Sequence, residues 1–361
     1  MISKNWSFLG MVLFLTGAAV GAGLFSLPRV FAGSFWLATI FLALCAFAVT
    51  SVHLLFLRAL ESRPVGDRHH LPGLLGERYG RVAEWTGSLL VVGGLLLSLC
   101  AQMLLSSNIL SDILGFQFEW SLLIVAVVFC LPLLLRPERF VGLERYAAGL
   151  LVVLLGILAA RAPQLPHISS PAISWPIVLG VVLFAYSSWT CIPSFVHLGQ
   201  GSAQRARAVR YAGAFVAVLY LLFGLTLSQT QAGLSPDFFA AAATWPSLLA
   251  RLAGVVAFVA IFLSFGYLSR ELRATLQRDF HLDVLLASAG VILVPYIAIV
   301  TGARSFLTLA AFAGGVFVAG QYLAILAVSL SAPASRRLKV AASIGGILFL
   351  VAIAGQLGYL F

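Results

Sequence analysis

Charged residues are scarce in this sequence of 361 residues. Asp, Glu, Lys and Arg make up 9% of it, whereas a soluble domain carries roughly a quarter. Hydrophobic residues make up 61% and gather in runs near the ~20 residues that cross a hydrocarbon core about 30 Å thick. The short alternating segments typical of a membrane β-barrel are missing. The sequence therefore predicts an all-α protein that crosses the lipid bilayer many times.

Signatures of enzymes and metal sites are missing as well. The sequence contains no H-E-x-x-H, no G-x-S-x-G and no phosphate-binding loop. Its four cysteines all fall within apolar segments, where cysteine serves as a small buried residue. We therefore expect no catalytic residue, no organic cofactor and no metal. An intramembrane enzyme is the least favoured class of function.

Eleven apolar segments are expected to cross the membrane as helices, and they are numbered here as spans 1 to 11. They are residues 8–34, 36–59, 82–110, 120–135, 140–160, 175–198, 209–229, 246–269, 284–301, 306–330 and 340–360. Because the loops between them are short, residues 1–361 are expected to form a single transmembrane domain. Lys4 precedes span 1 as in a signal peptide, but the apolar character continues to Phe35, so we expect this span to be retained.

The positive charges are unevenly distributed between the two sides that these spans define. If the N-terminus is cytoplasmic, 18 Arg and Lys residues lie inside and only Arg29, Arg161, Arg251 and Arg304 lie outside. Cytoplasmic loops are enriched in Arg and Lys. We therefore expect a multi-pass protein of the inner or plasma membrane with its N-terminus inside and its C-terminus outside. Nucleic acid is not an expected partner, because no basic stripe interleaves with stacking aromatic residues, and no obligate protein partner is indicated.

Spans 1 and 6 share an unusual feature, which is a set of residues that weaken helices. These are Gly17, Gly21, Gly23 and Pro28 in span 1, and Ser187, Ser188 and Pro193 in span 6. Five spans separate the two, so they enter the membrane from opposite sides. We predict a five-plus-five inverted repeat, residues 1–160 and 175–331, followed by an extra helix at 340–361. In transporters, a pair of interrupted segments at corresponding places in two halves marks the binding site.

Unwound backbone at span 1 has a specific chemical use. In hydrocarbon an unpaired amide costs several kcal/mol, so unwinding survives only where the backbone lines a cavity or binds a ligand. Gly21, Ala22 and Gly23 permit the unwinding. The N–H groups from Leu24 onward would then face a carboxylate, with help from the helix dipole. Close helix packing through small residues is the alternative.

Spans 3 and 6 supply the remaining substrate candidates. Freed carbonyls in span 6 would accept an ammonium group, and aromatic rings would form the wall of the pocket. The candidates are Phe25 in span 1, Gln102 in span 3, and Phe184, Ala185, Tyr186, Ser187 and Trp189 in span 6. Ordinary aromatic packing is the alternative for the rings, and a hydrogen bond to a neighbouring helix is the alternative for the Gln. Since the pocket offers no side-chain charge, it favours a neutral L-amino acid, aromatic ones ahead of small aliphatic ones.

Ionisable residues inside a membrane are functional candidates by default. His53 and His197 lie within spans towards the cytoplasmic side, where each is either a proton relay or a neutral hydrogen-bonded core residue. Arg29 follows Pro28 in the outer half of span 1 and either belongs to an outer gate or extends to the membrane surface. His70 falls in a loop and is expected to be solvated.

Three segments resemble a family of transporters. Residues 16–33 (TGAAVGAGLFSLPRVFAG) resemble the first helix of the amino acid/polyamine/organocation superfamily, in particular its aromatic and hydroxy amino acid permeases and amino acid/auxin permeases. Residues 184–193 (FAYSSWTCIP) are similar to the aromatic-rich run of that branch, and residues 201–213 to its basic loop. The resemblance implies a LeuT-type inverted repeat and ion-coupled symport of an amino acid by alternating access. A transporter-like sensor or accessory subunit that binds an amino acid without flux is the alternative.

The sequence departs from sodium-coupled relatives at two places. Leu24 stands where some of them carry a polar side chain, and Leu263-Ser264 stands where they often have Thr-Ser. We therefore expect protons rather than sodium as the coupling ion. One sodium site remains as an alternative, formed by the carbonyls of Gly17 and Val20 with the hydroxyl of Ser264.

Overall fold

The computed structural model of the chain describes most of its residues. These are 6–63, 70–135, 172–196, 198, 201–228 and 247–360, with six single positions between 149 and 160. The predicted span 5 falls largely outside this part of the chain, as do His197 and most of the loop that follows span 7. Every regular element within the described part is a helix, so the predicted all-α class is confirmed.

Helices of three kinds follow one another along the chain. The α-helices are α1 (Phe8–Ala19), α2 (Leu27–Gly33), α3 (Phe35–Glu61), α4 (Leu71–Tyr79), α5 (Arg81–Asn108), α6 (Phe118–Val128), α7 (Leu131–Leu134), α9 (Trp175–Tyr186), α10 (Ile192–Phe195), α11 (Ser202–Ser228), α13 (Ser247–Asp279), α14 (Val284–Val300), α15 (Phe306–Phe312), α16 (Ala319–Ser329) and α17 (Arg336–Leu360). Two 3-10 turns, η1 (Ala22–Ser26) and η4 (Trp189–Cys191), and two π-helical segments, η2 (Ile109–Ile113) and η6 (Ala313–Val318), join some of them.

Seven helices of the described part are long and apolar enough to cross a membrane, and the bent pair α1 and α2 brings the number to eight. The expected count of eleven long spans is therefore too high for these residues. Two predicted spans appear instead as the shorter apolar helices Phe118–Leu134 and Val284–Val300. The first is interrupted just before Pro132, which has no amide proton to donate. The chain is a multi-pass membrane protein.

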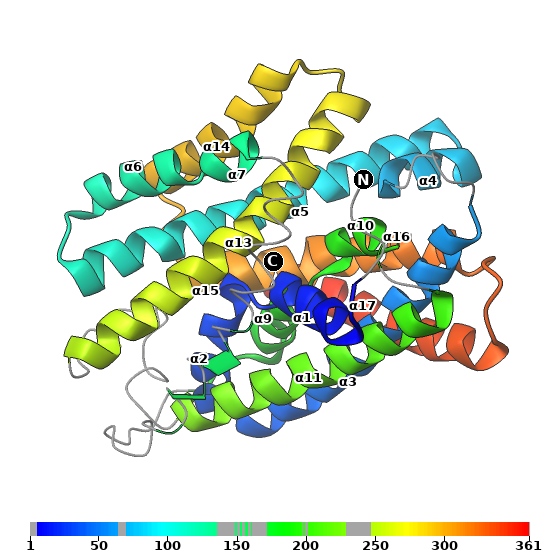
Figure 1. Cartoon of the computed structure of the whole chain (residues 1–361), viewed down its shortest axis with the longest axis horizontal. Coiled ribbons are helices and arrows are strands. Elements are labelled where there is room, and N and C mark those ends of the chain that lie inside the picture. The colour runs from blue at the N-terminus through cyan, green and yellow to red at the C-terminus, as the bar shows by residue number, and fades with distance from the viewer. Residues whose placement is uncertain are drawn as a thin grey trace.

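The two helices that carry the predicted breaks lie at the centre of the molecule. Figure 1 shows α1, α2 and α9 in the middle, with α3 and α11 along one side and α6, α7 and α14 on the opposite side. Apolar side chains point outward from the peripheral helices, as Leu285 and Ile347 do with 76% and 62% of their surface exposed. Such exposure suits contact with lipid rather than water.

Both central helices are interrupted where the sequence predicts. α1 ends at Ala19 because the backbone of Gly21 is extended, and the chain resumes as a helix bent by 58° from the first. α9 ends at Tyr186, and Ser187 and Ser188 are non-helical before η4 and α10 continue the span. The interruptions touch each other, since a Cβ atom added to Gly23 would lie 2.4 Å from the Cα atom of Ala185.

Candidate substrate site at the two helix breaks

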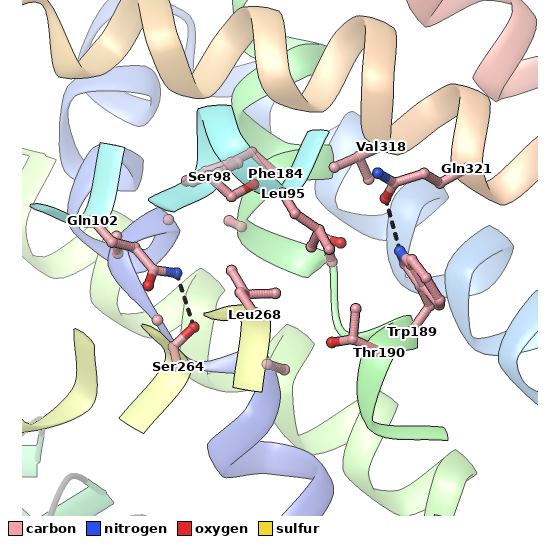
Figure 2. A pocket seen from close by; sticks show the side chains of 16 residues that line it. Leu95, Ser98, Gln102, Phe184, Trp189, Thr190, Ser264, Leu268, Val318 and Gln321 are labelled. Carbon is pink, nitrogen blue, oxygen red and sulfur yellow. Dashed lines mark hydrogen bonds between the residues drawn. The ribbon is translucent and has the colours of Figure 1, made fainter. Parts of the chain in front are cut away.

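A small cavity of about 30 Å³ lies where the two interrupted helices meet. Its lining comes from five parts of the chain (Figure 2). The residues are Ala19, Gly21, Ala22 and Gly23 from the first break; Phe184, Ala185, Ser187, Trp189 and Thr190 from the second; Leu95, Ser98 and Gln102 from α5; Ser264 and Leu268 from α13; and Val318 and Gln321 from η6 and α16. Within the described residues, this lining includes no Asp, Glu, Lys, Arg or His.

One side of the cavity is defined by a hydrogen bond between α5 and α13. Gln102 donates from Nε2 to Oγ of Ser264 at 3.0 Å (Figure 2). Both side chains lie against Gly21, because a Cβ atom there would approach Ser264 Oγ to 2.5 Å. The other amide atom, Gln102 Oε1, is buried and has no hydrogen-bond partner in the described structure. An unsatisfied buried acceptor is costly, so this oxygen is suited to receive a donor from a ligand.

The opposite side is held by a tryptophan and a second glutamine. Trp189 donates from its indole Nε1 to Oε1 of Gln321 at 2.7 Å, and Gln321 donates in turn to the carbonyl of Leu90 at 3.0 Å. Both side chains are almost fully buried. Gln321 was not among the residues predicted from the sequence, although it is a large amide in an otherwise apolar span, as Gln102 is.

Tyr220, from the middle of α11, connects the two breaks directly. Its hydroxyl lies 2.7 Å from the carbonyl oxygen of Ala19 and 2.8 Å from that of Ala185. These carbonyls belong to the last turns of α1 and α9, where a carbonyl has no N–H donor within its own helix. Tyr220 was not predicted from the sequence, because a tyrosine among apolar residues is typical of ordinary packing.

A second hydrogen-bonded group lies beside the cavity. Nε2 of His53 is 2.9 Å from the hydroxyl of Tyr322, and the same hydroxyl accepts the amide proton of Ser188 at 3.4 Å. His53 is buried and also lines a separate cavity of about 20 Å³ together with Ser188 and Tyr186. The histidine selected from the sequence is thus linked through Tyr322 to the break in the sixth span.

The structure brings most of the selected residues together but separates three from the central cavity. Leu24, Phe25 and Tyr186 are buried elsewhere and do not line it. Phe25 packs edge-on against Phe223, 5.9 Å between ring centroids, and Tyr186 donates to the carbonyl of Gly213. The expected aromatic wall therefore consists of Phe184 and Trp189. Two positions apart on a helix are about 200° apart in direction, so Phe184 and Tyr186 face opposite ways.

The ion and gate candidates are only partly assembled. Ser264 lies against the first break, but Gly17 and Val20 do not line the cavity, and the Ser264 hydroxyl already accepts a hydrogen bond from Gln102. Arg29 is half-buried in α2. Among the residues that the structure describes, no group of three or more His, Cys, Asp and Glu side chains could hold a metal ion.

His70 is not solvated, contrary to expectation. Its side chain is only 3% exposed, and Nε2 lies 3.1 Å from Oδ1 of Asp279, whose second oxygen accepts from Ser88 at 2.8 Å. The loop helix α4 packs against α5 and covers this group, which residue type alone does not reveal. At the same end of the molecule, Glu61 pairs with Arg205 at 2.8 Å.

Comparison with known proteins identifies the fold of the chain. No family model matches the sequence, and no curated protein matches it. Among solved structures, MhsT in complex with L-phenylalanine is similar, with a TM-score of 0.71 and 16% identity over 98% of this chain and 100% of that one. The chain has the LeuT fold. A manganese transporter of Eremococcus coleocola, in complex with an aromatic bis-isothiourea substituted compound, shares it with a TM-score of 0.67 and 14% identity over 97% of this chain and 86% of that one. At these identities the LeuT fold is what the likeness shows.

Proposed function

We propose that the chain is a secondary active transporter that carries a neutral L-amino acid, aromatic ones preferred, by alternating access. The observation that carries this proposal is the pair of broken helices whose interruptions meet around a buried polar cavity. In transporters of this kind, substrate and coupling ions bind at such breaks. The proposal includes the five-plus-five inverted repeat and a cytoplasmic N-terminus.

The chemistry of the cavity favours an amino acid over a metal ion. Divalent manganese prefers carboxylate and similar oxygen ligands, whereas the side chains that line this cavity are amides, hydroxyls and apolar groups. The amides of Ala22 and Gly23 open the second half of span 1 and are suited to a substrate carboxylate. The free Oε1 of Gln102 and the carbonyls that end α9 are suited to an ammonium group. MhsT, which shares the fold, was solved with L-phenylalanine.

The size of the cavity implies that the described conformation is closed around the site. A volume of about 30 Å³ holds roughly two water molecules, whereas ligand sites span about 300–1,000 Å³. An amino acid therefore needs the two breaks to move apart before it can enter. This requirement agrees with alternating access, in which one set of helices moves against another around the site.

Protons are the coupling ion that we propose. His53 is a buried titratable group that is linked to the second break through Tyr322. Histidine changes its charge near neutral pH when it is free to do so. Sodium remains the alternative, with the carbonyls of Gly17 and Val20 and the hydroxyl of Ser264 as its ligands; this hydroxyl accepts a hydrogen bond from Gln102.

A thermal-shift panel of the twenty amino acids on the purified protein tests the substrate class. A ligand at 100 times its dissociation constant stabilises a protein by about 2.7 kcal/mol. We expect the largest shifts from tryptophan, tyrosine and phenylalanine, and none from arginine, lysine or glutamate. If a charged amino acid or a manganese salt gave the largest shift and no aromatic amino acid gave any, the proposed substrate class would be wrong.

A further inference from the structure

The hydroxyl of Tyr220 occupies an unusual position between two backbone carbonyls of different broken helices. It is 2.7 Å from Ala19 O and 2.8 Å from Ala185 O, and its side chain is fully buried. Apart from the amide of Gly21, which donates to Ala19 O at 3.1 Å, no other donor to these two oxygens is seen in the described residues. Both alanines also line the central cavity.

A phenol cannot satisfy both carbonyls at once. It has one proton, so it donates to only one of them at a time, and the other carbonyl then faces a second oxygen at close range. A small cation would attract both oxygens together. Carbonyls freed at the ends of half-helices are the groups that bind the coupling cation in transporters with broken helices. The two carbonyls thus converge as they would around a cation, and a neutral hydroxyl lies between them.

We propose that the Tyr220 hydroxyl takes the place of a small monovalent cation between Ala19 O and Ala185 O. The wild-type protein then binds no cation at this point, and removal of the hydroxyl creates a site for sodium beside the substrate cavity. The inference refines the ion part of the proposed function.

Substitution of Tyr220→Phe removes one oxygen and leaves a gap of about the size of an ion. The melting temperature of the purified variant is measured without substrate, in sodium chloride and in choline chloride at equal ionic strength. We expect sodium to raise it by at least ~2 °C more than it raises that of the wild type, with a saturable dependence on concentration. Tyr186→Phe is the matched control, since Tyr186 also donates from α9 to a backbone carbonyl, that of Gly213, and should show no added sodium response.

Equal sodium responses in Tyr220→Phe, Tyr186→Phe and the wild type would overturn the inference. If Tyr220→Phe does not remain folded in choline chloride, the yield of folded protein after purification in each salt is measured instead. Purification in sodium chloride is then expected to yield folded protein, and equal loss in both salts contradicts the inference. Because no amino acid is present in this experiment, its outcome is independent of whether the proposed substrate is correct.

Discussion

The side-chain amide of Gln102 and the hydroxyl of Ser264 meet at 3.0 Å directly against Gly21. One hydrogen bond therefore joins α5 and α13 at the point where α1 is interrupted. The second amide atom of Gln102 is left without a partner in the described structure. A buried amide with one atom occupied and one unoccupied is suited to bind a ligand at this break.

Substitution of Gln102→Leu tests this role. We expect the affinity for the preferred amino acid to fall about 10- to 100-fold, which corresponds to the ~1–3 kcal/mol of a buried hydrogen bond. Dissociation constants from titrated thermal shifts measure the effect. Ser106→Ala is the control, because Ser106 is buried one turn away on α5 and its hydroxyl also has no partner in the described structure. An unchanged affinity in Gln102→Leu would exclude a contact between the Gln102 side chain and the bound amino acid.

Substitution of Gly23→Ala tests the contact between the two breaks. The added methyl group would lie 2.4 Å from Ala185 Cα, which is backbone and cannot rotate away. Overpacking of this kind costs about 1–3 kcal/mol or more, so we expect a lower melting temperature and the loss of substrate binding. Gly358→Ala, with open space around its Cβ position, should leave both unchanged. A Gly23→Ala protein with normal stability and binding would show that the breaks do not need to touch.

The hydrogen bond between Trp189 and Gln321 predicts an energetic coupling. Trp189→Phe or Gln321→Leu alone leaves a buried polar partner unsatisfied, at a cost of about 1–3 kcal/mol. The double variant should be less destabilised than the sum of the two single variants, because neither partner is then left behind. Denaturant or thermal unfolding in detergent measures the three free energies. Strict additivity would mean that the two side chains do not interact in solution.

The contact between His53 and Tyr322 predicts a specific effect on ion coupling. We expect His53→Gln and Tyr322→Phe to retain substrate binding in detergent but to lose uptake driven by a more acidic exterior. Uptake into proteoliposomes with and without a pH gradient separates the two effects. His70→Gln is the control, since that histidine is also buried but pairs with Asp279 away from the breaks. Undiminished gradient-driven uptake in His53→Gln would rule out His53 as the proton site.

Local sequence chemistry was sufficient to predict the breaks themselves. Glycines at 21 and 23 and the Ser187-Ser188 pair weaken a helix wherever they occur, and the structure interrupts both helices there. The multi-pass all-α class followed equally from the apolar runs. The number of spans could not be predicted from the apolar runs, because Pro132 interrupts one of these runs and shortens its helices.

Long-range partners and side-chain direction beyond a break were not predictable. Helical spacing gives the face of a residue only while the helix continues, so the direction of Phe25, which lies after the break in the first span, could not be extrapolated. The direction of Tyr186 could be, because α9 continues through this residue and Phe184 lies two positions before it. Tyr220 and Tyr322 owe their positions to contacts more than a hundred residues away in the chain. His70 was misjudged for the same reason, since its burial depends on how α4 packs.

Uptake of L-phenylalanine into proteoliposomes tests the central claim most directly. Purified wild-type protein is reconstituted, and accumulation of the labelled amino acid is followed under an inward proton gradient, with protein-free liposomes as the background. The account predicts accumulation above the background that is competed by tryptophan and tyrosine and not by arginine or glutamate. Binding of an amino acid in the thermal-shift panel, with no flux of that amino acid under either a proton or a sodium gradient, would contradict transport and identify the protein as a sensor or accessory subunit.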